Sequence, residues 1–265
     1  DAPVLGGFGS EVLKHAPFQA ENIQLLHAAG QRFLIGTDSP IPGAYGGSAQ
    51  FDVENAAPAT TSPPRSEAAP SPDARPGLGT TWGESRRSVI STSPFERADQ
   101  SSPFATAAVF YNDENGARAM ANASGFKRMS RGEVPVGGGV ASVFLKDESG
   151  NFLSGFEAGG KRFLVGEAGS RYSIIIQSHV PARMELVVSV DGLDVMDGKD
   201  ASFAKRGYLI DPNSTIEIDG FRQSTSSVAA FRFGAIGDSY AAQTGNARNV
   251  GVIGVAFFSE RGDTF

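Results

Sequence analysis

The residues with the clearest potential for chemistry are four aspartates that recur at every third position of the segment DGLDVMDGKD. They are Asp191, Asp194, Asp197 and Asp200. Carboxylate oxygens at this density are ligands that Ca²⁺ prefers, but the D-x-D-x-D-G order of a calcium loop is missing. Because alternate side chains of a strand face opposite ways, the four converge only if the chain turns between them. We therefore favour a solvated hairpin and assign no metal ligand.

A second segment has the outline of a phosphate-binding loop. Gly155 to Lys161, GFEAGGK, satisfies G-x4-G-K, but Arg162 follows where a Ser or Thr hydroxyl would hold magnesium. A phosphate loop also needs a helix after it, whose N-terminal amides bind the anion. The residues RFLV that follow are typical of a strand instead. We expect no nucleotide or other cofactor here.

Candidates for a nucleophile and a base are few. Gly237 to Tyr240, GDSY, resembles the start of the serine block of GDSL-type esterases over three residues, but no histidine follows to act as base. His15, His27 and His179 stand alone, without the spacing of a metal site. A glycosidase that uses two carboxylates is a third functional alternative, for which no acid–base pair can be named. We assign no catalytic residue and predict that the protein is not an enzyme.

Composition excludes several classes of partner and site. The net charge is −6 and the pI is near 5.2, and no cluster of Lys and Arg is present to neutralise phosphates, which argues against nucleic acid. Cysteine is absent, so disulfides, thiolate nucleophiles and cysteine-based metal sites are excluded. No apolar run approaches the length of a membrane-spanning helix, so we expect no membrane span.

The chain divides into three predicted parts, an arm at 1–54, a linker at 55–80 and a body at 81–265. From Asn55 to Pro76 the sequence consists mostly of Ala, Pro, Ser and Thr, which is typical of an extended linker. The arm is too short to bury a stable core alone, so we expect it to pack on the body or on another molecule. The start at Asp1, DAPVLGG without Met, suggests a mature form left after removal of a signal peptide, which predicts an extracytoplasmic location, secreted or at the cell surface.

The body consists of short alternating segments separated by turn residues. The 33 glycines and 15 prolines punctuate the chain as in all-β proteins. We predict strands at RRSVISTSPF, FATAAVFY and VAAFRF, among others, and a short helix or turn at residues 113–123. Four strands between Val140 and His179 are joined by DESGN, EAGG and EAGS, loops that suit antiparallel hairpins, and Asp191-Gly192 is a further hairpin pair.

These roughly ten to twelve strands predict an all-β fold. The expected architecture is an antiparallel β-sandwich, jelly-roll or immunoglobulin-like, with an N-terminal extended arm. Within it, Phe221, Phe231 and Phe233 are predicted core residues, and Arg222 and Arg232 need partners or solvent.

The C-terminal region carries a resemblance. RGYLIDPNSTIEIDGFRQSTSSVAAFRF, from Arg206 to Phe233, with SYAA and VGVIGVAFF after it and YSIIIQSH and RMELVVSVDGLDVMDG before it, is the most distinctive part of the chain. It resembles the C-terminal part of a group of bacterial exported proteins. The resemblance covers about the last hundred residues, implies a bacterial exported origin and brings no activity with it.

Two functions are predicted. The first is a non-enzymatic structural protein, a self-assembling subunit of a bacterial surface layer or filament, whose partners are other copies of itself. The linker, the short arm, the missing catalytic set and the apolar segment VGVIGVAFF favour it, although that segment fits an interior strand equally well. The alternative is a carbohydrate- or ligand-binding module of the periplasm or cell surface, which binds surface polysaccharide through Trp82, Tyr111 and Tyr240.

One heptad occurs almost twice. GQRFLIG at 30–36 and GKRFLVG at 160–166 share five identical residues and two conservative exchanges, and the similarity does not extend outwards, so it is not a domain duplication. A chance match is the competing interpretation. If the similarity is real, both copies are glycine-bounded strands, one in the arm and one in the body.

Overall fold

The computed structural model of the chain describes residues 77–121 and 127–263. The predicted arm, nearly all of the linker, His15, His27 and the first heptad copy lie outside the described residues. The first described strand, β1, begins at Leu78, slightly before the predicted start of the body at residue 81.

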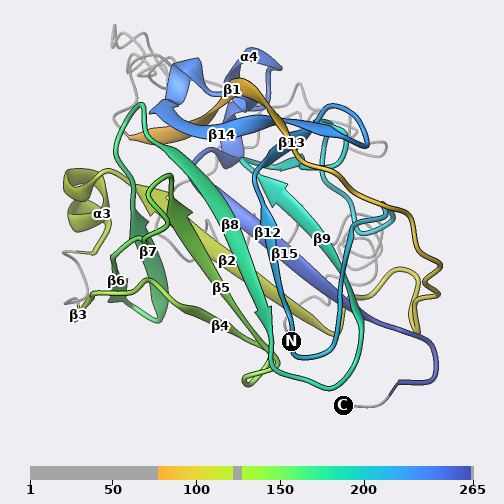
Figure 1. Ribbon diagram of the computed structural model, residues 1–265. Helices are drawn as coiled ribbons and strands as arrows, with labels where there is room; N and C mark the ends of the chain where they lie inside the picture. Colours follow the sequence, from red (N-terminus) through yellow and green to blue (C-terminus); the bar gives the residue numbers. More distant parts are fainter. Residues whose placement is uncertain (1–76, 122–126, 264–265) are drawn as a thin grey trace, which may run out of the picture. The chain divides into compact units, whose positions relative to one another are not determined.

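The described residues form two β-sheets, each of which we name after one of its interior strands (Figure 1). The β8 sheet has the order β1 (Leu78–Arg87), β14 (Ser227–Ala235), β8 (Arg171–Ser178), β5 (Ala141–Asp147) and β4 (Val134–Val136), with β12 (Thr215–Ile218) also paired to β8 and β13 (Gly220–Arg222) to β14. The β15 sheet has the order β10 (Leu193–Asp194), β9 (Met184–Val190), β15 (Val252–Ser259), β2 (Ala105–Asn112), β7 (Lys161–Val165), β6 (Gly155–Ala158) and β3 (Lys127–Met129), with β11 (Tyr208–Ile210) also paired to β9. The strands pair antiparallel except for the parallel pair β2 and β7, so the predicted all-β sandwich is confirmed.

The two sheets enclose one apolar core. On β8, Tyr172, Ile174 and Ile176 alternate toward it, and on β9 Leu186 and Val188 do the same. This period of two is the geometry of a pleated strand with one face in the core. The core also contains the three phenylalanines predicted from sequence, Phe221, Phe231 and Phe233.

The connections differ from the predicted hairpins. EAGG does join two antiparallel neighbours, β6 and β7, and Asp191-Gly192, with φ of 55° and 84°, turns between β9 and β10. DESGN turns the chain back on itself, because Lys146 and Phe152 form an antiparallel bridge across it, but this pairing does not extend to β6. EAGS does not join paired strands. The chain passes from β5 in the β8 sheet to β6 in the β15 sheet, and from β7 back to β8. A short Gly-bearing loop is compatible with either course, because local turn chemistry does not specify which sheet the next strand enters.

The predicted strand RRSVISTSPF is wrong for most of its length. Only Arg86 and Arg87 belong to β1, and the residues after them form no regular strand. The amides of Ser88 and Ile90 still donate to the carbonyl oxygens of Ser226 and Thr225, but Pro94 lacks an amide proton and cannot extend a ladder.

Helical structure is limited to short segments within the described residues. The predicted helix at 113–123 is α3 (Glu114–Ala121), where Glu114 and Arg118 form an ion pair one turn apart. Three shorter segments lie between β14 and β15, namely η2 (Ile236–Asp238), α4 (Tyr240–Gln243) and η3 (Ala247–Asn249). None of these described helices is long and apolar enough to cross a membrane.

The apolar segment VGVIGVAFF forms β15, and β15 is an interior strand. It pairs with β9 along one edge and with β2 along the other, and every residue from Val252 to Phe258 is buried. Of the two interpretations left open by the sequence, the interior core strand is therefore the correct one.

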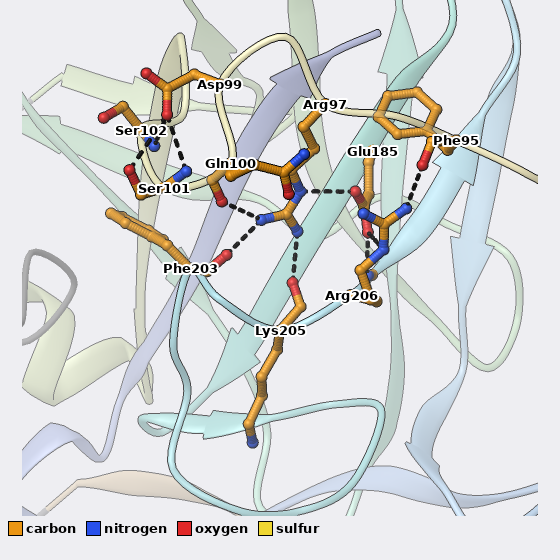
Figure 2. A network of polar contacts seen from close by, with 11 residues as sticks. Phe95, Arg97, Asp99, Gln100, Ser101, Ser102, Glu185, Phe203, Lys205 and Arg206 are labelled. Carbon is orange, nitrogen blue, oxygen red and sulfur yellow. Dashed lines mark hydrogen bonds and ion pairs between the residues drawn. The ribbon is translucent and has the colours of Figure 1, made fainter. Parts of the chain in front are cut away.

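A buried ion pair lies on the outer face of the β15 sheet. Arg97 and Glu185 are each 1% exposed, and Arg97 Nε lies 2.8 Å from Glu185 Oε2. The Arg97 guanidinium also lies 3.7 Å from the centre of the Phe258 ring and donates to the carbonyl oxygens of Phe203 and Lys205. Figure 2 shows that Arg97 reaches Glu185 and the two carbonyls from one central position. The pair thus fastens two irregular segments to the sheet.

The second oxygen of Glu185 is also occupied. Glu185 Oε1 accepts a hydrogen bond from the amide of Gly207 at 2.8 Å and lies 3.2 Å from Arg206 Nε. Gly207 allows this approach, because a Cβ at its position would stand 1.9 Å from the carbonyl oxygen of Leu186. Since both oxygens are used, we interpret Glu185 as structural.

We expect Arg97→Met to lower the free energy of unfolding by about 3 kcal/mol or more, because it leaves Glu185 buried with only Arg206 as a charged partner. Urea denaturation monitored by fluorescence measures the change. The double variant Arg97→Met/Glu185→Gln should be less destabilised than Arg97→Met, because no buried charge is then left behind. If the double variant is the less stable of the two, the ion pair does not have this role.

Candidate functional site

Three aromatic side chains from separate parts of the chain meet at one place. Trp82 lies 4.7 Å from Tyr240 and 5.8 Å from Phe221, measured between ring centres, and Phe221 lies 5.3 Å from Tyr240. Trp82 is 40% exposed, whereas Phe221 is buried and Tyr240 is half-buried. Trp82, Tyr240 and Phe221 are called the aromatic cluster below.

Each member is fixed by its own element. Trp82 lies in the edge strand β1 opposite Phe231, and Phe221 lies in β13 opposite Ala229. Tyr240 is the first residue of α4, whose N-cap is Ser239. The cluster therefore rests on paired strands and a capped helical turn, which limits its movement without any ligand.

The polar ends of the two accessible rings are unused. Within the described residues, neither the indole N–H of Trp82 nor the hydroxyl of Tyr240 has a hydrogen-bond partner. Gly198, with φ of 68°, runs close to this hydroxyl, since a Cβ there would lie 3.1 Å from it. An exposed ring beside a free donor and a free hydroxyl is suited to a ligand with an apolar face and a hydroxylated edge.

Tyr111, the third aromatic proposed from sequence, is not part of this surface. It is 2% exposed, and its hydroxyl donates to Asp191 Oδ1 at 2.6 Å. Its position in β2 turns it toward the core, which a count of aromatic residues in the sequence does not reveal. The prediction that Tyr111 contacts a ligand is therefore withdrawn.

Asp191 is the centre of a buried polar network. Besides Tyr111, the amides of Thr80 and Gly251 donate to its carboxylate, at 2.8 and 2.9 Å. Thr80 Oγ1 lies 2.7 Å from the Tyr111 hydroxyl and 2.6 Å from that of Tyr172. Because Tyr111 donates to Asp191, Thr80 must donate to Tyr111 and accept from Tyr172. The three hydroxyls then form one chain directed at the carboxylate.

The four aspartates do not meet in one site. Asp194 accepts from the amide of Met196, and its other oxygen is buried without a partner in the described residues. Asp197 pairs with Lys205 at 2.7 Å. Asp200 accepts from the side-chain amide of Asn246. No group of three or more metal-ligating side chains occurs within residues 77–121 and 127–263.

The remaining sequence motifs have structural positions. Gly155 to Lys161 is the β6–β7 hairpin, with a strand in place of the helix that a phosphate loop requires. Ser239 is fully buried, donates to the carbonyl of Ile236 and accepts from the amide of Ala242, so the GDSY segment is a turn and helix cap. His179 is exposed, and its Nε2 lies 3.0 Å from Ser142 Oγ.

Two buried carboxyl groups are shifted toward protonation. Burial raises the pKa of Asp191 to about 6, although hydrogen bonds from Tyr111, Thr80 and Gly251 oppose the shift. Burial also raises the pKa of Asp194 to about 6, against the hydrogen bond from Met196. These values lie in the range of a general acid or base, but both side chains are only 1% exposed, so no substrate reaches them.

Sequence reasoning missed two features of this region. Phe221 is predicted only as a core residue, although its ring also stacks on that of Trp82. Arg86 is correctly predicted to lie in a strand, but its position in a polar cleft on the outer face of the β8 sheet is not predicted. In the sequence, Arg86 and Phe221 are marked only by their positions in β1 and β13. Such a position shows which face of the sheet a side chain occupies only once the strand register is known.

Comparisons with protein-family models, with curated proteins and with solved structures found no match to this chain.

The free energy of unfolding should increase as the pH falls from 7 to 5. Asp191 and Asp194 titrate near 6 in the folded state and near 3.8 in the unfolded chain, so the folded state binds more protons in this window. Each group should contribute about 1 kcal/mol between the two pH values. Urea denaturation at a series of pH values measures the slope.

Asp191→Asn and Asp194→Asn should each flatten this slope, whatever their effect on absolute stability. Asp238→Asn serves as the control for the same exchange at an exposed position. A wild-type stability that decreases steadily from pH 7 to pH 5 would contradict the assignment.

Proposed function

We propose that this protein is a non-enzymatic carbohydrate-binding β-sandwich that acts outside the cytoplasm and binds polysaccharide through the aromatic cluster. The proposal rests on one observation. Trp82 is held half-exposed against Tyr240, and neither the indole N–H nor the phenol hydroxyl has a hydrogen-bond partner among the residues that the structure describes. Sugar rings present C–H groups on one face and hydroxyls at the edge, so such a pair meets both parts of the ring.

The packing of Phe221 against Trp82 supports this proposal. Its ring is stacked on Trp82 with an angle of 5° between the planes, so one side of the indole is already packed against the protein. A ring fixed in this way loses little side-chain entropy on binding, which favours affinity. Trp82 is also one of three large apolar side chains that are exposed in the described residues, together with Val89 and Phe104.

A glycan array followed by titration calorimetry tests the proposal. Trp82→Ala should weaken binding about tenfold or more, because stacked tryptophans are frequent hot spots of binding. Tyr240→Phe removes only the hydroxyl and should weaken binding less, by about three- to tenfold. Phe104→Ala is the matched control, because Phe104 is 39% exposed and lies outside the cluster.

Equal loss of binding in Trp82→Ala and Phe104→Ala would contradict a specific role of the cluster. Absence of binding to every polysaccharide on the array would overturn the proposed function itself.

The self-assembling surface subunit predicted from sequence stays a prediction. One of its grounds is removed, because β15 is interior. The edge strand β1 also carries Glu84, Arg86 and Arg87, and charges on an edge strand discourage pairing with another sheet. Light scattering at increasing concentration measures the assembly state, and a strictly monomeric protein at high concentration would contradict self-assembly.

A further inference from the structure

The outer face of the β8 sheet has a polar cleft of about 120 Å³. It lies apart from the aromatic cluster, because the register of β1 shifts between Trp82 and Ser85. This bulge places Arg86, opposite Val228, on the face away from the core, whereas Trp82 faces the side of Phe231. Three cationic side chains, Arg86, Lys146 and Arg171, line the cleft.

The carboxylates of the cleft are already engaged. Glu217 is paired with Lys146 at 2.5 Å. Although burial raises it, the pKa of Glu217 is held below its usual range by hydrogen bonds from Lys146 and Ser173. Asp147 accepts hydrogen bonds from the amides of Ser149 and Asn151, in the turn that follows β5. These two carboxylates each accept at least two hydrogen bonds, whereas Glu148, the third carboxylate of the cleft, is 53% exposed and lies 3.6 Å from Arg171.

Two of the three cations are engaged as well. Lys146 is bound by Glu217, and Arg171 lies 2.8 Å from Glu84 and 3.6 Å from Glu148. Arg86 differs from both. It makes no hydrogen bond or ion pair within the described residues, although its positive charge acts to lower the pKa of the Glu217 and Asp219 carboxyls. Arg86 as a whole is half-buried, and a guanidinium carries five N–H donors.

Among the cations of the cleft, the guanidinium of Arg86 therefore has the donors that no described residue engages. A planar guanidinium with free N–H groups matches two oxygens of one anionic group, and Lys146 has further N–H groups beside it. We infer that the cleft binds an oxyanion, a carboxylate or sulfate group, through Arg86, and that this is a second ligand site of the protein. The source of the group is either an acidic sugar or a small free anion.

The net charge of −6 opposes the approach of an anion over long distances. At physiological ionic strength this repulsion is screened beyond about 8 Å, so local contacts decide. The expected affinity should fall as salt is raised further, because the contact between Arg86 and the ligand is itself partly exposed.

Titration calorimetry with matched ligands tests the inference. The probes are inorganic sulfate, trigalacturonate, and the methyl ester of trigalacturonate, which has the same rings without the charge. Arg86→Gln should weaken binding of the charged probes about tenfold or more, since charge-assisted hydrogen bonds are lost. Arg87→Gln, which removes the same charge from the next, exposed residue of β1, should have little effect. Arg86→Lys should recover part of the loss.

The possible outcomes distinguish the two sources of the anionic group, and they distinguish this inference from the proposed function. Arg86-dependent binding of sulfate identifies a small free anion, and Arg86-dependent binding of trigalacturonate alone identifies an acidic sugar. Equal binding of trigalacturonate and its ester, or equal effects of Arg86→Gln and Arg87→Gln, overturns the inference and leaves the aromatic cluster untouched. No binding of sulfate or trigalacturonate to the wild type also overturns it. Thermal unfolding confirms that each variant is folded.

Discussion

The packing of the two sheets on each other depends on the hydrogen bonds that the Asp191 carboxylate accepts. It is buried at the turn between β9 and β10, and it receives hydrogen bonds from Thr80 in β1, Tyr111 in β2 and Gly251 before β15. β1 belongs to the β8 sheet and β2 to the β15 sheet, and Gly251 directly precedes β15. One carboxylate thus accepts hydrogen bonds from donors in both sheets. Without it, the buried amide of Thr80 in the edge strand β1 would lack a partner.

This contact also determines where the candidate sites lie. Because β1 is fixed at Thr80, its next residues are held at the edge of the sheet, with Trp82 on one face and, after the bulge, Arg86 on the other. Arg97 and Glu185 have a comparable role on the outer face of the β15 sheet, where they fasten irregular segments. Both networks bury charge, and both are fully hydrogen-bonded around that charge, which is the condition under which such groups are tolerated.

Much of the strand content could be predicted, as could the tight turns, but the sheet that each strand enters could not. The alternation of FATAAVFY and RMELVVSV indicates strands because one face of each lies in the core. Loops such as EAGS, in contrast, carry the same turn residues whether the chain forms a hairpin or crosses to the other sheet. RRSVISTSPF was predicted as a strand from its composition, but Pro94 and the absence of a pairing partner leave most of it irregular. Tyr111 shows the same limit, since its burial depends on which way β2 faces.

The sequence by itself determined the all-β class, the strand character of most apolar segments, the positive φ of Asp191 and Gly192, and the exclusion of cysteine chemistry. These properties follow from side-chain type and from periods of two to four residues, which are local. The tertiary structure alone decided that the aspartates separate, that Trp82 meets Tyr240 and Phe221, and that Arg86 has no ion-pair partner among the described residues. These depend on strand register and on contacts between residues far apart in the chain, and a shift of one residue in register moves every side chain of a strand to the other face.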